Sequence, residues 1–159
     1  MKSTRPNPIK AVLRGTACFL LLTLNASAHA GAFFGVTPYT PGDDPSAWQW
    51  MFTQEDGPTG YNPTLLVNTG DTYYFEIYVD SMHPEQTHTF WIDNSPGLGG
   101  LDPYYAGLST NGVEGGTGLI TMNLPADAPD VLYYSCSEHS SMAGTIVVNH
   151  DLLFRNGFN

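Results

Sequence analysis

Three soft side chains lie three residues apart in the run YYSCSEHSSMAGTIVV (residues 133–148): Cys136, His139 and Met142. A thiolate, an imidazole and a thioether are ligands that together suit a copper ion passing between Cu(I) and Cu(II). Cys136 ends one predicted strand, and the next begins near Gly144. A single loop between two strands would therefore present all three ligands.

Such a site needs a second imidazole from another part of the chain. His88 lies in THTFWID (residues 87–93), where it shares one face of a predicted strand with apolar side chains. His83, in the polar turn SMHPEQTH, is the alternative fourth ligand. We prefer His88 because it begins the alternating run. The predicted metal ligands are His88, Cys136, His139 and Met142.

Each of these residues also has an ordinary structural interpretation. Cys136 is the only cysteine after residue 30, so it has no disulfide partner in that part of the chain. A lone thiol in an oxidising compartment can be buried and inert, can pair with another chain or can bind a metal. The three ligand types at one strand junction favour the metal. His150 follows the last predicted strand and has no expected role.

Residues 1–30 have the layout of a secretory signal peptide: four basic residues, an apolar run from Thr16 to Leu24, and small residues at the end. The apolar run is about half the length of a membrane-spanning helix, so no span is expected after cleavage. Cleavage fits after Ala30 or after Ala28, and the protein is expected in the periplasm or outside the cell. Cleavage after Ala28 would expose His29 as an N-terminal copper ligand, but no second histidine has a matching context.

Residues 31–159 are expected to form one domain. Only Arg155 remains there against fifteen carboxylates, which gives a formal net charge of −14. Such a surface repels nucleic acid and anionic membranes and attracts basic partners. Solubility in a salty medium is the alternative explanation of the charge.

Short runs of alternating hydrophobicity predict strands, and no long stretch has helical periodicity. Together with turns rich in Gly, Pro and Asp, they indicate an all-β sandwich. The residues expected to face the core are Trp48, Trp50, Phe52, Tyr73, Phe75, Ile77, Val79, His88, Phe90, Ile92, Ile120, Met122, Leu124, Leu132, Tyr134, Cys136, Ile146 and Val148.

One long stretch, residues 94–117, contains seven glycines and no clear periodicity. A structureless loop of this length is uncommon in a compact domain. We therefore expect either a functional loop or a short helix near Pro103, Tyr104 and Tyr105. The structure of the tail, residues 150–159, is not predicted.

The segments THTFWID, YYSC, CSEHSSM and GTIVV resemble those of the cupredoxins, the type 1 blue copper proteins. The resemblance covers about residues 60–149, and the ligand loop is similar to the short loop of amicyanin-like proteins. Other segments resemble plastocyanin-like secreted bacterial proteins. The resemblance implies an eight-stranded Greek-key sandwich with copper near one end. It places the copper ligands on His88, Cys136, His139 and Met142.

Several positions differ from the family pattern. Thr89 stands where many cupredoxins have the Asn that ties the two ligand segments together, and Ser137 offers a hydroxyl for the same tie. Glu138 replaces a common Pro, while Ser140 and Ser141 replace bulky apolar residues. The rim around His139 should therefore be polar and acidic. A redox partner with a basic docking surface is expected.

The resemblance implies one-electron transfer. The predicted leader makes it an exported protein, which is expected to be a monomer. Copper storage or delivery is the alternative, and loss of the metal in favour of an adhesive role is a weaker one. A single-chain enzyme is not expected, because the neighbours of Cys136 are Ser135 and Ser137 rather than a histidine for a second copper. The chain also has few histidines and no second domain.

Overall fold

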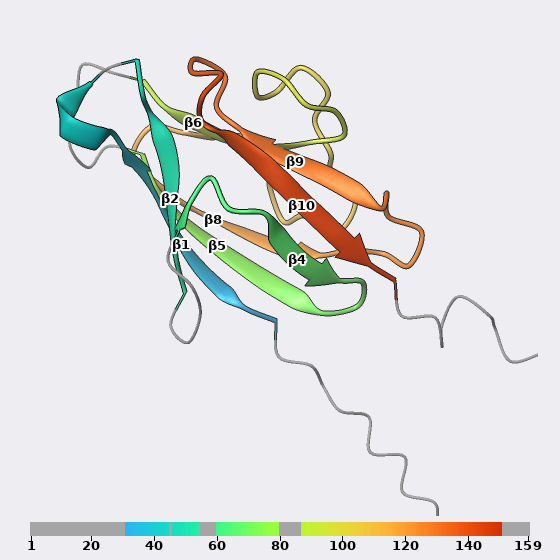
Figure 1. The fold of residues 1–159 in the computed structure, drawn as a ribbon. Helices are drawn as coiled ribbons and strands as arrows, with labels where there is room; N and C mark the ends of the chain where they lie inside the picture. Colours follow the sequence, from blue (N-terminus) through green and yellow to red (C-terminus); the bar gives the residue numbers. More distant parts are fainter. Residues whose placement is uncertain (1–30, 45, 55–59, 80–86, 151–159) are drawn as a thin grey trace, which may run out of the picture.

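The computed structural model describes residues 31–44, 46–54, 60–79 and 87–150 (Figure 1). They form two five-stranded sheets, and one short 3-10 turn, η1 (Pro41–Asp43), lies between the first two strands. The first sheet has the order β3 (Gly60–Tyr61), β2 (Gln49–Gln54), β1 (Phe33–Tyr39), β5 (Thr72–Tyr78), β8 (Thr117–Asn123). The second has the order β4 (Leu65–Asn68), β10 (Ala143–Asn149), β9 (Val131–Ser135), β6 (Thr89–Asp93), β7 (Val113–Glu114).

The predicted all-β sandwich is confirmed. Alternating side chains from both sheets meet in one core, and every residue expected to face that core is buried. Aromatic rings fill its centre: Phe90 lies between Trp50, at 5.2 Å between ring centroids, and Tyr134, at 5.9 Å. Burial of this aromatic surface is the main force that holds the two sheets together.

The chain passes repeatedly between the two sheets, which gives the expected Greek-key connectivity. β1 and β2 are antiparallel neighbours, but β1 also pairs in parallel with β5, and β4 pairs in parallel with β10. β9 pairs antiparallel with both β6 and β10. The last residue of β9 and the first residues of β6 and β10 therefore lie together at one end of the sandwich (Figure 1).

Strand β1 was not among the strands predicted from the sequence. Its segment, FFGVTPY, contains a glycine and a proline, which weaken a strand pattern. Phe34 and Val36 nevertheless point into the core. Pairing with β2 on one side and β5 on the other stabilises the strand, and no local signal reports such pairing.

Of the two alternatives for residues 94–117, the short helix near Pro103, Tyr104 and Tyr105 is absent from the described residues, and the segment is a loop. The backbone pairs instead with β6: the Tyr104 amide donates to the Ile92 carbonyl at 2.9 Å, and Pro103 forms a bridge with Asp93. Asn111 extends this pairing, because its side chain both accepts from the Ile92 amide and donates to the Ile92 carbonyl. Residues 94–112 form a hydrogen-bonded cover over β6.

The cover also packs on the Trp91 ring through glycines. A Cβ atom at Gly112 would lie 2.3 Å from that ring, and one at Gly99 would lie 2.7 Å from it. Because this loop pairs with Asp93 through Gly100 and Pro103, Asp93 is buried although the alternation placed it on the side away from the core.

Among the described residues, no helix is long and apolar enough to cross a membrane. The predicted leader, residues 1–30, and most of the tail lie outside the described residues. The signal peptide and its cleavage site therefore stay predictions.

Gly144→Ala should destabilise the fold. The new Cβ would lie 2.1 Å from the Tyr134 hydroxyl oxygen and 2.3 Å from its Cζ, in a ring that is fully buried. That hydroxyl donates to the Pro63 carbonyl, so the ring has little freedom to move away. Overpacking of this kind costs about 1–3 kcal/mol, measurable by urea denaturation.

The matched control is Gly60→Ala. Its Cβ would meet Pro63 at 3.6 Å, an ordinary contact. The free energy of unfolding should change by less than about 0.5 kcal/mol. Equal stability of the two variants would contradict the packing described for Tyr134.

Candidate metal centre

The ligand loop, residues 136–142, joins β9 to β10. The Cys136 amide donates to the Met142 carbonyl, and the Met142 amide donates to the His139 carbonyl, both at 3.0 Å. These two bonds close the loop tightly, so its three predicted ligands lie on one short, folded segment. His88 directly precedes β6, which pairs with β9, and this pairing brings the fourth residue to the same end of the sandwich.

The structure brings three of the four predicted residues together. One potential ligand atom from each of His88, Cys136 and His139 lies within 4.8 Å of the other two. The Cys136 Sγ and the His139 Nδ1 are 3.8 Å apart, and the two imidazole centroids are 4.8 Å apart.

The separation of Cys136 Sγ and His139 Nδ1 fits a shared metal ion. Metal–imidazole and metal–thiolate bonds of about 2.0 and 2.3 Å at a trigonal angle place the two ligand atoms roughly 3.8 Å apart. The distance between Cys136 Sγ and His139 Nδ1 agrees with that value. A thiolate and two imidazoles are ligands for a soft or borderline transition metal.

Met142 is fully buried and follows His139 on the same loop. Its main chain is bonded to both Cys136 and His139, so its position is fixed relative to both residues. A thioether has no charge and no strong hydrogen-bonding group, so the interior can hold it at little cost. Its role as the weak axial ligand stays a prediction.

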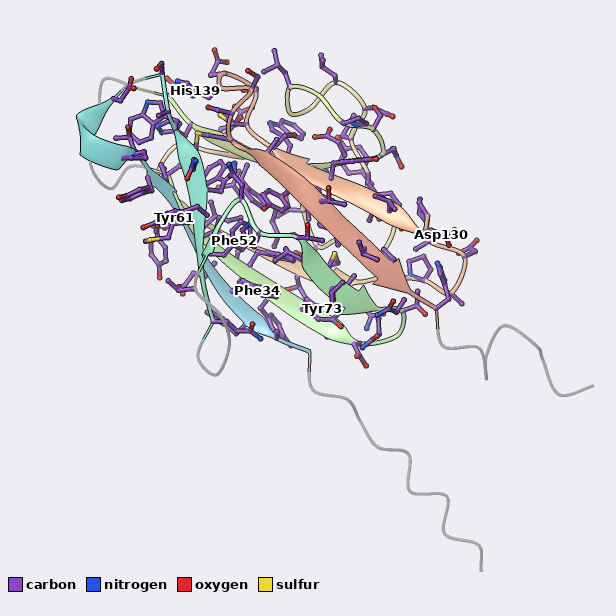
Figure 2. All side chains as sticks on the ribbon, viewed as in Figure 1. Phe34, Phe52, Tyr61, Tyr73, Asp130 and His139 are labelled. Atoms are coloured by element: carbon purple, nitrogen blue, oxygen red, sulfur yellow. The ribbon has the colours of Figure 1, made fainter. Side chains whose placement is uncertain are left out.

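Burial differs among the three residues that converge. Cys136 and His88 are buried, whereas His139 is partly exposed at the end of the sandwich, where Figure 2 shows it. Partial burial lowers the pKa of His139 below its usual value, against an opposing effect of the neighbouring Glu138 carboxylate. The lower pKa favours the neutral imidazole, which is the form that binds a metal.

The predicted tie between the two ligand segments is present. The Thr89 hydroxyl accepts a hydrogen bond from the Ser137 amide at 2.9 Å and bonds with the Ser137 hydroxyl at 2.7 Å. One residue later, the Glu138 amide points to the Cys136 sulfur at 3.4 Å. Thr89 therefore joins the residue after His88 to the residue after Cys136.

A second support, on the side of residues 94–112, was not predicted. The Gly99 amide donates to the Cys136 carbonyl at 2.9 Å. The buried Asp93 carboxylate accepts from the Ser135 hydroxyl at 2.8 Å and from the Gly100 amide at 3.1 Å. The loop that the glycine content singled out thus holds the main chain of Cys136, a predicted ligand.

A third support comes from the residue before β2 and the residue after β3, and it was also not predicted. Trp48, which is 2% exposed, lies against His88 with 4.5 Å between ring centroids and an interplanar angle of 62°. Asn62 bonds to Trp50 of β2 and donates to the Ser141 carbonyl at 2.7 Å. The alternation did place Trp48 in the core, but it gave no sign of the contact with His88.

Of the remaining histidines, only His150 lies in the part of the chain that the structure describes. His83 and His29 lie outside the described residues, so the alternative ligand stays untested. His150 contacts the Ala126 carbonyl and the Asp130 carboxylate, each at 3.1 Å. Figure 2 shows Asp130 at the end of the sandwich away from His139.

The rim beside His139 has the polar character expected from the sequence. Glu138, Ser140 and Ser141 are all exposed. The described residues contain no Lys or Arg, so no positive side chain of that part offsets the Glu138 carboxylate.

The chain is similar to solved structures of rusticyanin, a copper protein, and of auracyanin B, both cupredoxins. Rusticyanin from Thiobacillus ferrooxidans has 20% identity and a TM-score of 0.47, with 74% of this chain and 76% of that chain covered. Auracyanin B has 16% identity and a TM-score of 0.42, with 74% and 88% covered. No model of a known protein family matches the chain, and no curated protein is significantly similar to it. The functional inference therefore depends on the geometry of the site itself.

Thr89→Val should loosen the site, because valine keeps the shape but removes the acceptor of the Ser137 amide. Leaving that amide and the Ser137 hydroxyl without this partner should cost about 1–3 kcal/mol in the free energy of unfolding. Thr117→Val, at an exposed position of β8, is the control and should change it by less than about 0.5 kcal/mol. Equal urea midpoints for the two variants would contradict the tie.

Proposed function

We propose that this chain, which is similar to the cupredoxins in its motifs and its β-sandwich, binds one copper ion and carries single electrons in an exported protein. His88, Cys136, His139 and Met142 would hold the ion. The observation that carries the proposal is the convergence of three ligand atoms within 4.8 Å in a buried, braced site. A copper ion bound there would accept and release one electron.

The surrounding residues supply a geometry that changes little between the two oxidation states. The tie from Thr89 and the bond from Gly99 fix the main chain on both sides of Cys136. The Glu138 amide stabilises negative charge on the Cys136 sulfur. Because His139 is the partly exposed ligand, its ring offers the shortest route from the site to the surface.

The braced site favours a carrier over the alternative of copper storage or delivery. A delivery site has to open to release its ion, whereas the main chain around Cys136 is bonded to two other segments. Repeated reduction and reoxidation in the presence of a Cu(I) chelator separates the two functions. A carrier keeps its copper, and a delivery protein loses it.

The hydrogen bonds of the two neighbours of Cys136 favour a single-metal carrier over an enzyme with a second metal beside the cysteine. The Ser135 hydroxyl is bonded to the buried Asp93 carboxylate, and the Ser137 hydroxyl is bonded to Thr89. The hydroxyl groups of both Ser135 and Ser137 are therefore already bonded within the protein.

Export to the periplasm or the exterior is part of the proposal and depends on the predicted leader. The unpaired Cys136 is compatible with an oxidising compartment, since its thiol is fully buried and would be occupied by the metal.

Adding Cu(II) to the purified chain should give an intense thiolate-to-copper absorption band in the visible spectrum. Cys136→Ser should abolish that band, because it removes the thiolate that donates the charge. Ser140→Ala, an exposed change in the same loop, should leave the band unchanged. A colourless complex, or a weak band that persists in Cys136→Ser, would contradict the proposed function.

The proposed partner is a redox protein with a basic docking surface. Its association should slow by about tenfold or more from low to high ionic strength, because exposed opposite charges are screened. Glu138→Gln should reduce this salt dependence, and Ser140→Ala should not. Stopped-flow electron exchange with a small basic redox protein measures both, and a rate independent of salt would rule out charge-driven docking.

A further inference from the structure

The site is contacted by a part of the chain that carries none of the copper-ligand motifs. Trp48 immediately precedes β2 and contacts both imidazoles: its ring centroid lies 4.5 Å from that of His88 and 6.2 Å from that of His139. The side chain of Asn62 reaches from the segment after β3 to the ligand loop. Both residues approach the site from the first sheet, whereas the predicted ligands lie on or beside the second.

We infer that Trp48 and Asn62 are positioning residues that form a clamp, which holds the two imidazoles and the ligand loop in place before a metal binds. This inference rests on the proposed function only where it assumes that the residues held by the clamp bind a metal. The clamp itself is a property of the metal-free protein.

Trp48 holds His88 by packing. Its indole is 2% exposed and meets the imidazole at an interplanar angle of 62°, an edge-to-face arrangement. A ring confined in this way has few rotamers available. The entropy that metal binding would otherwise lose in ordering the ligand is thus already lost on folding. The same indole keeps water from that side of His88.

Asn62 holds the ligand loop through hydrogen bonds. Its own amide donates to the Trp50 carbonyl, and its side-chain oxygen accepts from the Trp50 amide, both at 2.8 Å. Its side-chain nitrogen then donates to the Ser141 carbonyl at 2.7 Å. Ser141 lies between the predicted ligands His139 and Met142. Asn62 therefore connects this part of the ligand loop to Trp50 of β2.

The backbone of Asn62 supports this specific role. Its φ is +43°, and it is the one non-glycine residue with a positive φ among the described residues. Asparagine tolerates this conformation better than most residues. The conformation lets both the main chain and the side chain of Asn62 face Trp50.

The clamp acts opposite the tie from Thr89. Thr89 holds the ligand loop at Ser137, near its start, and Asn62 holds it at Ser141, near its end. A loop fixed at both ends by bonds to different sheets keeps its shape when one ligand is disturbed.

The test compares Trp48→Leu with Phe34→Leu. Phe34 is a similarly buried aromatic residue that stacks on Phe75 at 5.1 Å, and it is not among the residues found around the site. Both variants should lose stability through cavity formation. Only Trp48→Leu should broaden or shift the His88 ring resonances in ¹⁵N NMR spectra of the metal-free protein. Trp48→Phe should restore most of the wild-type signal.

Asn62→Asp is the second variant. The carboxylate still accepts from the Trp50 amide, but it cannot donate to the Ser141 carbonyl. The His139 ring resonances should broaden, and those of His88 should stay as in the wild type. With Co(II) as the probe, release to a chelator should be about tenfold faster than in Phe34→Leu, a typical loss for residues that position ligands.

The clamp is refuted if Trp48→Leu and Asn62→Asp match Phe34→Leu in both ring resonances and Co(II) release. Failure of the proposed function looks different. In that case the wild type gives no thiolate-to-copper band, while the metal-free resonances still report whether the clamp orders the two rings.

Discussion

The antiparallel pairing of β9 with both β6 and β10 is the constraint on which the site depends. It places the end of β9, the start of β10 and the start of β6 at one point, and these are the positions of Cys136, Met142 and His88. The aromatic core fixes the distance between the sheets, and the first sheet can therefore reach the same point with Trp48. A change that separated β6 from β9 would remove His88 from the cysteine without altering either residue.

Much of the core and of the site could be predicted from the sequence, because both depend on local patterns. Period-two alternation is a property of a few adjacent residues, and it correctly placed residues such as Phe75, Phe90 and Tyr134 inside. The spacing of the three loop residues is likewise local. His88 needed only one long-range assumption, that an inward-facing histidine on another strand would reach the loop.

The parts that could not be predicted depend on tertiary partners. Strand β1 owes its existence to pairing on both sides, and the stretch near Tyr104 is extended because it bonds to Ile92 rather than to itself. Asn62 contacts Ser141 across 79 positions of sequence, a contact that no local motif encodes. Glycines at 99 and 112 signalled a special loop, but only the packing on Trp91 explains them.

The supports of the ligand loop reach it largely through main-chain atoms. Gly99 bonds to a carbonyl of the loop, Asn62 bonds to another, and Thr89 accepts from an amide. The exposed side chains of Glu138, Ser140 and Ser141 provide none of these three bonds. The outer side chains of the loop can therefore change while the main-chain bonds that hold its shape are kept. If the loop binds a metal and a partner as proposed, these two properties could evolve separately on seven consecutive residues.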